Sequence, residues 1–274
     1  MVNIRFILML LFIPSFMLGN HTSVPFQSEK GLIIVEAEIN DHGGLFILDT
    51  GASDILINKK LVSSSTQFKT AHGDIEAEEI RLDEIQLGLI NARNLSAYAM
   101  DLSHIEKHLD LEIAGILGGR SLYHGIIEIN KAREVIIFHT DVPGVEKPMN
   151  RIDYSIVEGV PVCTVVVEND EHAFILDSGA SNHFFDKRFI AQHTKSFHPL
   201  DNHAVVFSAT SEKVQEKYLV SSLDLEGLKL QEVKVTSGDY STLLENTTVS
   251  GLLSLTELSK GSIFIDTKNQ VVLY

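Results

Sequence analysis

Two aspartates stand in almost identical surroundings and are the pair of residues in this sequence best suited to do chemistry together. The octapeptide Phe-Ile-Leu-Asp-Thr-Gly-Ala-Ser at residues 46–53 returns as Phe-Ile-Leu-Asp-Ser-Gly-Ala-Ser at residues 174–181, with seven of the eight positions identical. The aspartates are Asp49 and Asp177, so the two copies lie 128 positions apart. In each copy an apolar stretch leads to a carboxylate and then to a glycine turn, and glycine leaves room for another chain segment to approach closely.

The chemistry open to two neighbouring carboxyl groups is acid–base catalysis. If the two turns meet at a pseudo-twofold axis, the carboxyl groups cannot both ionise, so they share a proton and their pKa values separate. One state then holds a general base beside a general acid. Such a pair can deprotonate a water molecule and protonate a peptide carbonyl in the same step, without a metal or a covalent intermediate.

The surroundings of the two aspartates also repeat, which indicates an internal duplication. Residues 114–118 (AGILG) parallel residues 250–254 (SGLLS), and residues 129–138 parallel residues 265–274, both at an offset of 136 positions. Because this offset exceeds the first one by eight positions, the second unit is expected to carry an insertion between its two motifs.

Each unit begins with a pattern typical of a β-hairpin. Apolar-rich segments at 32–39 and 161–167 are followed by polar turns, expected at 41–44 and 169–172, and then by the aspartate-containing segments. Most of the remaining chain consists of short apolar-rich runs between turn residues, often alternating at period two, so the chain is predicted to be mainly β. Short helices are expected at 102–111, 121–124 and 255–260.

The two aspartate motifs, each followed by a hydrophobic-hydrophobic-Gly-like motif, resemble those of the pepsin and retropepsin aspartic peptidases. The resemblance extends from residue 31 to residue 274. It implies a mainly β fold with two homologous lobes, each a six-stranded type of β-barrel, related by a pseudo-twofold axis and separated by a cleft. The alanines three positions after each aspartate, Ala52 and Ala180, are similar to those of the retroviral type.

The resemblance also implies the roles of particular residues. Asp49 and Asp177 would form the catalytic dyad, and segments 115–118 and 251–254 would thread beneath the two turns. Ser254 stands where the family motif has glycine, so the supporting loop of the second lobe is expected to be imperfect. The residues expected to support the dyad, with the two hydroxyls bonding to the opposite lobe, are Thr50, Gly51, Ser178 and Gly179.

A flap hairpin that closes over the substrate is expected in each lobe. In the first lobe its tip is placed at His72 and Gly73, where His72 is either a polar flap tip or an ordinary turn residue. In the second lobe the tip is placed at Ala209 and Thr210.

The function predicted from these motifs is that of an aspartic endopeptidase acting on extended polypeptides. The alternative is a non-catalytic peptide-binding protein of the same fold. The expected partner is a polypeptide substrate, no cofactor is expected, and the chain is expected to be a monomer because it carries both aspartates. The formal net charge of −15 argues against nucleic acid and anionic membranes as partners.

The domain organisation predicted from the sequence starts with a signal peptide. Residues 1–18 carry one charged side chain, Arg5, and an apolar stretch too short to span a bilayer comfortably, which predicts a signal peptide over 1–20 and a secreted or periplasmic protein. An uncleaved amino-terminal anchor remains the alternative. The other predicted units are an N-terminal lobe at 24–142, a linker at 143–151 and a C-terminal lobe at 152–274.

Other reactive residues have simpler explanations. His104 and His108 are four positions apart, but Ile105 occupies the place of the glutamate that a zinc-protease helix needs, so a solvated helix face is expected and no metal. Cys163 is the single cysteine, which excludes an intramolecular disulfide, and its apolar surroundings predict a buried, unreactive thiol.

Overall fold

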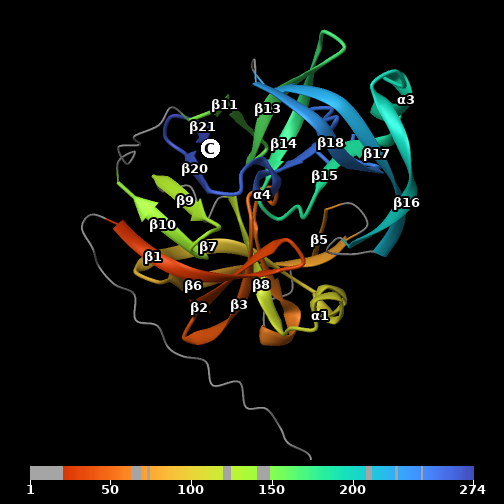
Figure 1. The fold of residues 1–274 in the computed structure, drawn as a ribbon. Coiled ribbons are helices and arrows are strands. Elements are labelled where there is room, and N and C mark those ends of the chain that lie inside the picture. The colour runs from red at the N-terminus through yellow and green to blue at the C-terminus, as the bar shows by residue number, and fades with distance from the viewer. Residues whose placement is uncertain are drawn as a thin grey trace, which may run out of the picture.

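The structure is a computed structural model, and it describes residues 21–62, 69–72, 75–119, 125–140, 149–207, 212–225, 228–241 and 243–274 (Figure 1). Several predicted features lie outside these residues: the signal peptide at 1–20, the flap residues Gly73, Ala209 and Thr210, the helix at 121–124, and most of the linker at 143–151. The last linker residue, Arg151, begins a strand.

Six strands of the first half close into a barrel, in the order β2-β3-β8-β4-β7-β6, with β6 pairing back onto β2. Strand β8 is buried along its whole length because it lies in the middle of the sheet, parallel to β3. It therefore reads as a continuous apolar run rather than an alternating one. The strands of this barrel are β2 (Leu32–Ile39), β3 (His42–Asp49), β4 (Ile55–Asn58), β6 (Ile75–Leu87), β7 (Ile90–Met100) and β8 (Ile113–Gly118).

The second half repeats this arrangement, in the order β13-β14-β19-β15-β18-β17, and β17 closes the barrel by pairing with β13. Figure 1 shows the first barrel in orange and yellow below and the second in green and blue above it. The strands of the second barrel are β13 (Val160–Val167), β14 (Asp170–Asp177), β15 (His183–Asp186), β17 (Glu212–Leu225), β18 (Leu228–Gly238) and β19 (Gly251–Ser254). The predicted fold class, mainly β with two six-stranded barrel lobes, is confirmed.

An antiparallel sheet joins the lobes, in the order β11-β21-β20-β9-β10-β1, with three strands from each half of the chain, and β1 continues it into the first barrel by pairing with β2. At its centre Glu128 of β9 pairs with Phe264 of β20, which is also its counterpart at the 136-position offset. A residue opposite its own counterpart marks the pseudo-twofold axis of the sheet. The strands are β1 (His21–Glu29), β9 (Ile126–Asn130), β10 (Val135–His139), β11 (Arg151–Asp153), β20 (Ser262–Asp266) and β21 (Val271–Leu273).

The hydrophobic core is continuous through this joining sheet. One cluster of buried side chains includes Phe46 of the first barrel, Ile129 and Ile263 of the joining sheet, and Phe174 of the second barrel. Cys163 belongs to the same cluster and is 4% exposed, which confirms the predicted burial of its thiol. Among the described residues, no helix has the length and apolar character needed to cross a bilayer.

The hairpin turns before the aspartates are shorter than predicted. Strand β3 already begins at His42 and β14 at Asp170, so the turns consist of Asn40-Asp41 and Glu168-Asn169. All four residues have positive φ, between 45° and 75°. Two-residue turns of this kind match the right-handed twist of the strands, and that match lets the strands extend into the polar segments.

The insertion predicted in the second unit lies in the hairpin of β16 (Phe197–Phe207) and β17. In the first lobe, 21 positions separate the start of β5 (Lys69–His72) from the start of β7. In the second lobe, 31 positions separate the start of β16 from the start of β18. The connection from the end of β18 to Gly251 is two residues shorter than the one from the end of β7 to Gly115, so the net difference between the lobes is eight residues. The ten extra residues lengthen the second hairpin by roughly 15 Å.

Helices α1 (Ser103–Leu109) and α4 (Leu255–Leu258) confirm two of the expected helices, while α3 (Lys187–Gln192) was not predicted. Asp186 caps α3 by accepting a hydrogen bond from Arg188 N, and the helix buries Phe189 and Ile190. A helix this short depends on packing rather than on propensity, so its sequence carries little signal. The remaining short elements are η1 (Lys59–Leu61) and β12 (Ser155–Val157).

Candidate active site

The two aspartates end equivalent strands and come together between the lobes. Asp49 is the last residue of β3 and pairs with Gly118 of β8, and Asp177 is the last residue of β14 and pairs with Ser254 of β19. The parallel neighbour supports each strand up to the carboxylate, after which the chain turns. The side chains of Asp49 and Asp177 are hydrogen-bonded to each other.

The residue after each aspartate binds the opposite lobe. Thr50 N donates to Ser178 Oγ, and Ser178 N donates to Thr50 Oγ1, both at 3.0 Å. Thr50 Oγ1 also donates to the carbonyl of Leu176 at 3.0 Å, and Ser178 Oγ donates to the carbonyl of Leu48 at 3.1 Å. Thr50 is 2% exposed and Ser178 is fully buried, so water does not compete for these four bonds. They hold the two turns in one relative position.

The glycines of the motif are required by close approach across the axis. A Cβ on Gly51 would lie 2.7 Å from Oδ2 of Asp177, and a Cβ on Gly179 would lie 2.6 Å from Oδ2 of Asp49. Both distances are well inside van der Waals contact. Each turn therefore packs against the carboxyl group of the other lobe, which only a residue without a side chain permits.

Burial determines the electrostatics of the aspartate pair. Burial raises the pKa of Asp49, although hydrogen bonds from Asp177 and from the backbone of Ala52 and Gly51 act in the opposite direction. Burial raises the pKa of Asp177 further above its usual range, and the neighbouring charge of Asp49 adds to this shift. Asp177 is also only 7% exposed. The two groups titrate as a pair that holds one shared proton over an extended pH range.

Backbone amides bind one oxygen of each carboxyl group. Gly51 N and Ala52 N donate to Asp49 Oδ1 at 2.8 and 3.1 Å, and Gly179 N donates to Asp177 Oδ1 at 2.6 Å. Ser53 is the last residue of the first motif, but its hydroxyl donates to Asp54 Oδ2 at 2.6 Å. Its single proton is therefore not available to Asp49.

Ser254 does not leave the second supporting loop imperfect, contrary to expectation. Its side chain is fully buried, and its Oγ donates to the carbonyl of Ala180 at 2.6 Å. In the first lobe the carbonyl of Ala52 accepts instead from the backbone N of Gly119, at 2.7 Å. The serine hydroxyl thus binds the carbonyl that a backbone amide binds in the other lobe.

His183 also belongs to this site, although it was not predicted from the sequence: its Nδ1 accepts a hydrogen bond from Ser254 N at 3.1 Å. Its counterpart in the first lobe is Ile55. The sequence does carry a signal for it. The second copy differs from the first at both of these positions, with His183 in place of Ile55 and Ser254 in place of Gly118.

Hairpins stand where the flaps were predicted. In the first lobe β5 and β6 pair from Lys69 with Glu78 to His72 with Ile75, so His72 ends its strand beside the tip. In the second lobe the last pair of the β16–β17 hairpin joins Phe207 and Glu212. Of the predicted tip residues, Gly73, Ala209 and Thr210 fall between these pairs and outside the described residues.

No metal centre is formed within the described part of the chain by groups of histidine, cysteine, aspartate or glutamate. His104 and His108 lie on α1 as predicted, but both are half-buried rather than fully solvated.

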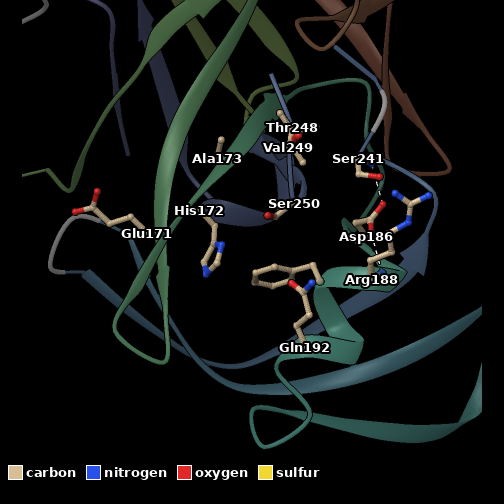
Figure 2. A pocket seen from close by; sticks show the side chains of 11 residues that line it. Glu171, His172, Ala173, Asp186, Arg188, Gln192, Ser241, Thr248, Val249 and Ser250 are labelled. Carbon is tan, nitrogen blue, oxygen red and sulfur yellow. Dashed lines mark hydrogen bonds between the residues drawn. The ribbon is translucent and has the colours of Figure 1, made fainter. Parts of the chain in front are cut away.

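A pocket of about 340 Å³ lies in the second lobe between β14, α3 and the segment before β19 (Figure 2). Its lining includes His172, Asp186 and Arg188. The carboxylate of Asp186 already accepts hydrogen bonds from the backbone N atoms of Arg188, Tyr240 and Ser241. This acid therefore stabilises the fold, and the pocket contains neither residue of the aspartate pair.

Comparisons with known proteins agree with this site. Residues 35–120, which include Asp49, match the family model for aspartyl proteases. Among solved structures, the chain is similar to basic 7S globulin from soybean, with a TM-score of 0.51 and 10% sequence identity, over 93% of this chain and 94% of that one. No curated protein sequence matches the chain.

The fold is therefore pepsin-like, and the resemblance to aspartyl proteases is confirmed over residues 35–120. The family match supports a function of the protease type. The identity to the globulin is too low to support more than the shared fold.

Proposed function

We propose that the chain is an aspartic endopeptidase that hydrolyses extended polypeptides with water activated between Asp49 and Asp177. The observation that carries the proposal is the pair of hydrogen-bonded carboxyl groups, held across the lobe interface by Thr50 and Ser178. The simplest way for such a protein to lose activity is to lose one aspartate, and both are present.

In the proposed mechanism the pair starts with one shared proton. The more deeply buried Asp177 is the better host for this proton, since burial favours the neutral form. The Asp49 carboxylate removes a proton from the water as it attacks the peptide carbonyl, and Asp177 protonates the carbonyl oxygen. Asp49 then passes the proton that it took from water to the leaving nitrogen, and Asp177 takes a proton back from a hydroxyl of the tetrahedral intermediate as the C–N bond breaks. The pair is left with its single proton on Asp177.

The test is hydrolysis of denatured casein, with and without a statine-type inhibitor, followed by mass spectrometry of the released peptides. We expect cleavage by the wild type, inhibition by the statine, and no cleavage by an Asp177→Asn variant. An inactive wild type that still binds the statine would instead support the alternative, a non-catalytic peptide-binding protein.

We further propose that the chain is exported and that its lobes arose by duplication. Export rests on the signal-like composition of residues 1–20, and amino-terminal sequencing of the secreted or periplasmic protein would test it. Duplication is supported by the repeated strand order of the two barrels and by the pairing of Glu128 with its own counterpart, Phe264.

A further inference from the structure

The two lobes support their aspartate turns differently. In the first lobe β4 begins with Ile55, and the residue opposite Asp49 is Gly118. In the second lobe the equivalent strand β15 begins with His183, and the residue opposite Asp177 is Ser254. Both exchanges replace a residue without polar side-chain atoms by one that has them, and the two new side chains belong to one hydrogen-bonded group.

The contacts of this group lead from His183 to the turn that carries Asp177. His183 Nδ1 accepts from Ser254 N at 3.1 Å, and Ser254 Oγ donates to the carbonyl of Ala180, three residues after the aspartate. Thr256 Oγ1 lies 2.9 Å from the same Ser254 oxygen. His183 is 6% exposed and Ser254 fully buried, so water cannot replace a lost partner at low cost.

We propose that His183 is a positioning residue for Asp177, acting through Ser254, and that protonation of its ring weakens this support. The inference rests on the proposed function. Only the neutral ring can accept the Ser254 N–H bond, because both ring nitrogens of a protonated histidine are donors. Protonation would make Nδ1 a donor, so it could no longer accept the hydrogen bond from Ser254 N. It would also place a charge in the protein interior.

The surroundings of His183 fix the pH at which this happens. Burial lowers the pKa of His183 to about 4. The strands beside it present Val235 of β18 and Ser254 of β19, neither of which titrates in this range. On the elements that pack against β15, the ionisable residues are Lys229, Glu232 and Lys234 on β18 and Lys187 and Arg188 on α3, while β19 carries none. Asp186 lies on β15 itself, and Asp177 ends β14, the strand beyond β19.

The sign of the effect follows from the lowered pKa. Between about pH 6.5 and pH 4 the unfolded chain protonates this histidine while the folded chain does not, so folding stability decreases as the pH falls through this window. Below about pH 4 the folded protein is protonated as well, and the support of the Asp177 turn is lost.

Three variants test the proposal. His183→Asn keeps an acceptor near Nδ1 but does not titrate. His183→Ile removes the acceptor and leaves Ser254 N unpaired. The double variant His183→Ile/Ser254→Gly installs the residue pair that the first lobe has, Ile55 and Gly118. It is the matched control, because it shares with His183→Ile the loss of the ring and any change in packing.

The activity measurements are pH profiles of kcat and KM on a peptide substrate. For His183→Asn we expect kcat at about pH 5–6 to stay close to that of the wild type, because an acceptor for Ser254 N is kept. For His183→Ile we expect kcat to fall at least tenfold with little change in KM, and the double variant to recover much of that loss. A His183→Ile variant with the kcat of the wild type would overturn the inference.

Thermal unfolding gives a readout that does not need hydrolysis. Between pH 6.5 and pH 4 the Tm of the wild type should fall more steeply than that of His183→Asn. Equal slopes overturn the inference, whether or not the protein cleaves peptides. Unequal slopes in a wild type without hydrolytic activity would overturn the proposed function, and the positioning role with it, while leaving the His183–Ser254 contact in place.

Discussion

Thr50 and Ser178 donate their backbone amides to each other's hydroxyl oxygens, at 3.0 Å in both directions, across the interface between the lobes. Neither residue takes a direct part in the proposed chemistry. Because both hydroxyls also bind carbonyls of the opposite strand, the position of one aspartate relative to the other depends on four buried hydrogen bonds.

Thr50→Val should therefore destabilise the protein although it preserves the shape of the side chain. It leaves Ser178 N and the carbonyl of Leu176 without partners in a buried site, and we expect a loss of about 2–4 kcal/mol in the free energy of unfolding. Thr50→Ser, which copies the second lobe, is the control and should cost less than about 1 kcal/mol. Urea denaturation of both variants measures the difference, and a loss in Thr50→Val no larger than in the control would contradict the role of the hydroxyl.

Asp49→Asn and Asp177→Asn should each abolish hydrolysis while the fold persists. The two carboxyl groups share one proton and act as a general acid and a general base, so losing either aspartate removes the acid–base pair. The measurement is kcat/KM on a peptide substrate together with circular dichroism. Turnover near that of the wild type in either single variant would refute the dyad.

The carboxyl group of Asp177 should make the wild type less stable at neutral pH than the Asp177→Asn variant. Because burial raises the pKa of Asp177, the unfolded chain ionises at a lower pH than the folded one, and stability decreases as the pH rises above the unfolded value of 3.8. Asparagine carries no such cost. The Tm of Asp177→Asn minus that of the wild type should increase from pH 4 to pH 7, and a constant difference would show that the carboxyl group is not held neutral.

Gly51→Ala should inactivate the protein because its Cβ would lie 2.7 Å from Oδ2 of Asp177. Gly43→Ala is the matched control, since a Cβ there has nothing within 4 Å. We expect kcat/KM to fall by at least a hundredfold in the first variant, about 2.7 kcal/mol of transition-state stabilisation, and to be unchanged in the second. Similar activity of the two variants would mean that the turns do not approach as closely as described.

The pH optimum of hydrolysis should be weakly acidic, at about pH 5–6. Neither Ala52 nor Ala180 has a hydroxyl to stabilise an ionised carboxylate, and burial raises the pKa of both aspartates, so the singly protonated pair persists to higher pH. A profile of kcat/KM against pH measures this directly. An optimum as acidic as about pH 2–3 would show that other donors lower the pKa values of the pair.

The protein should be active as a monomer, because one chain supplies both turns and the hydrogen bonds between them. Sedimentation at micromolar concentration should give a mass near 30.4 kDa for the full chain. An obligate dimer whose activity disappears on dilution would contradict this expectation.

Much of the candidate site was predictable because the chain carries two copies of the same motif. The repeat of residues 46–53 at 174–181 identified Asp49 and Asp177, and the glycine after each hydroxyl residue indicated a close approach. Strands 32–39 and 160–167 followed from their apolar runs. These features depend on local residue order, which a sequence shows directly.

Other features depend on contacts between distant segments, and only the tertiary structure decided them. The insertion was counted from the sequence as eight residues, but its place in the β16–β17 hairpin, with two residues removed elsewhere, follows from strand pairing. Helix α3 exists because Phe189 and Ile190 find a core to pack against.

The difference is clearest at Ser254. The sequence by itself determined that a serine replaces the expected glycine, and on that basis the loop looked defective. The structure places His183, 71 positions earlier, where its Nδ1 accepts the Ser254 amide, and it places the carbonyl of Ala180 where it accepts the hydroxyl. Whether a buried polar group destabilises a protein depends on its partners, and partners this far apart in the chain are brought together only by the fold.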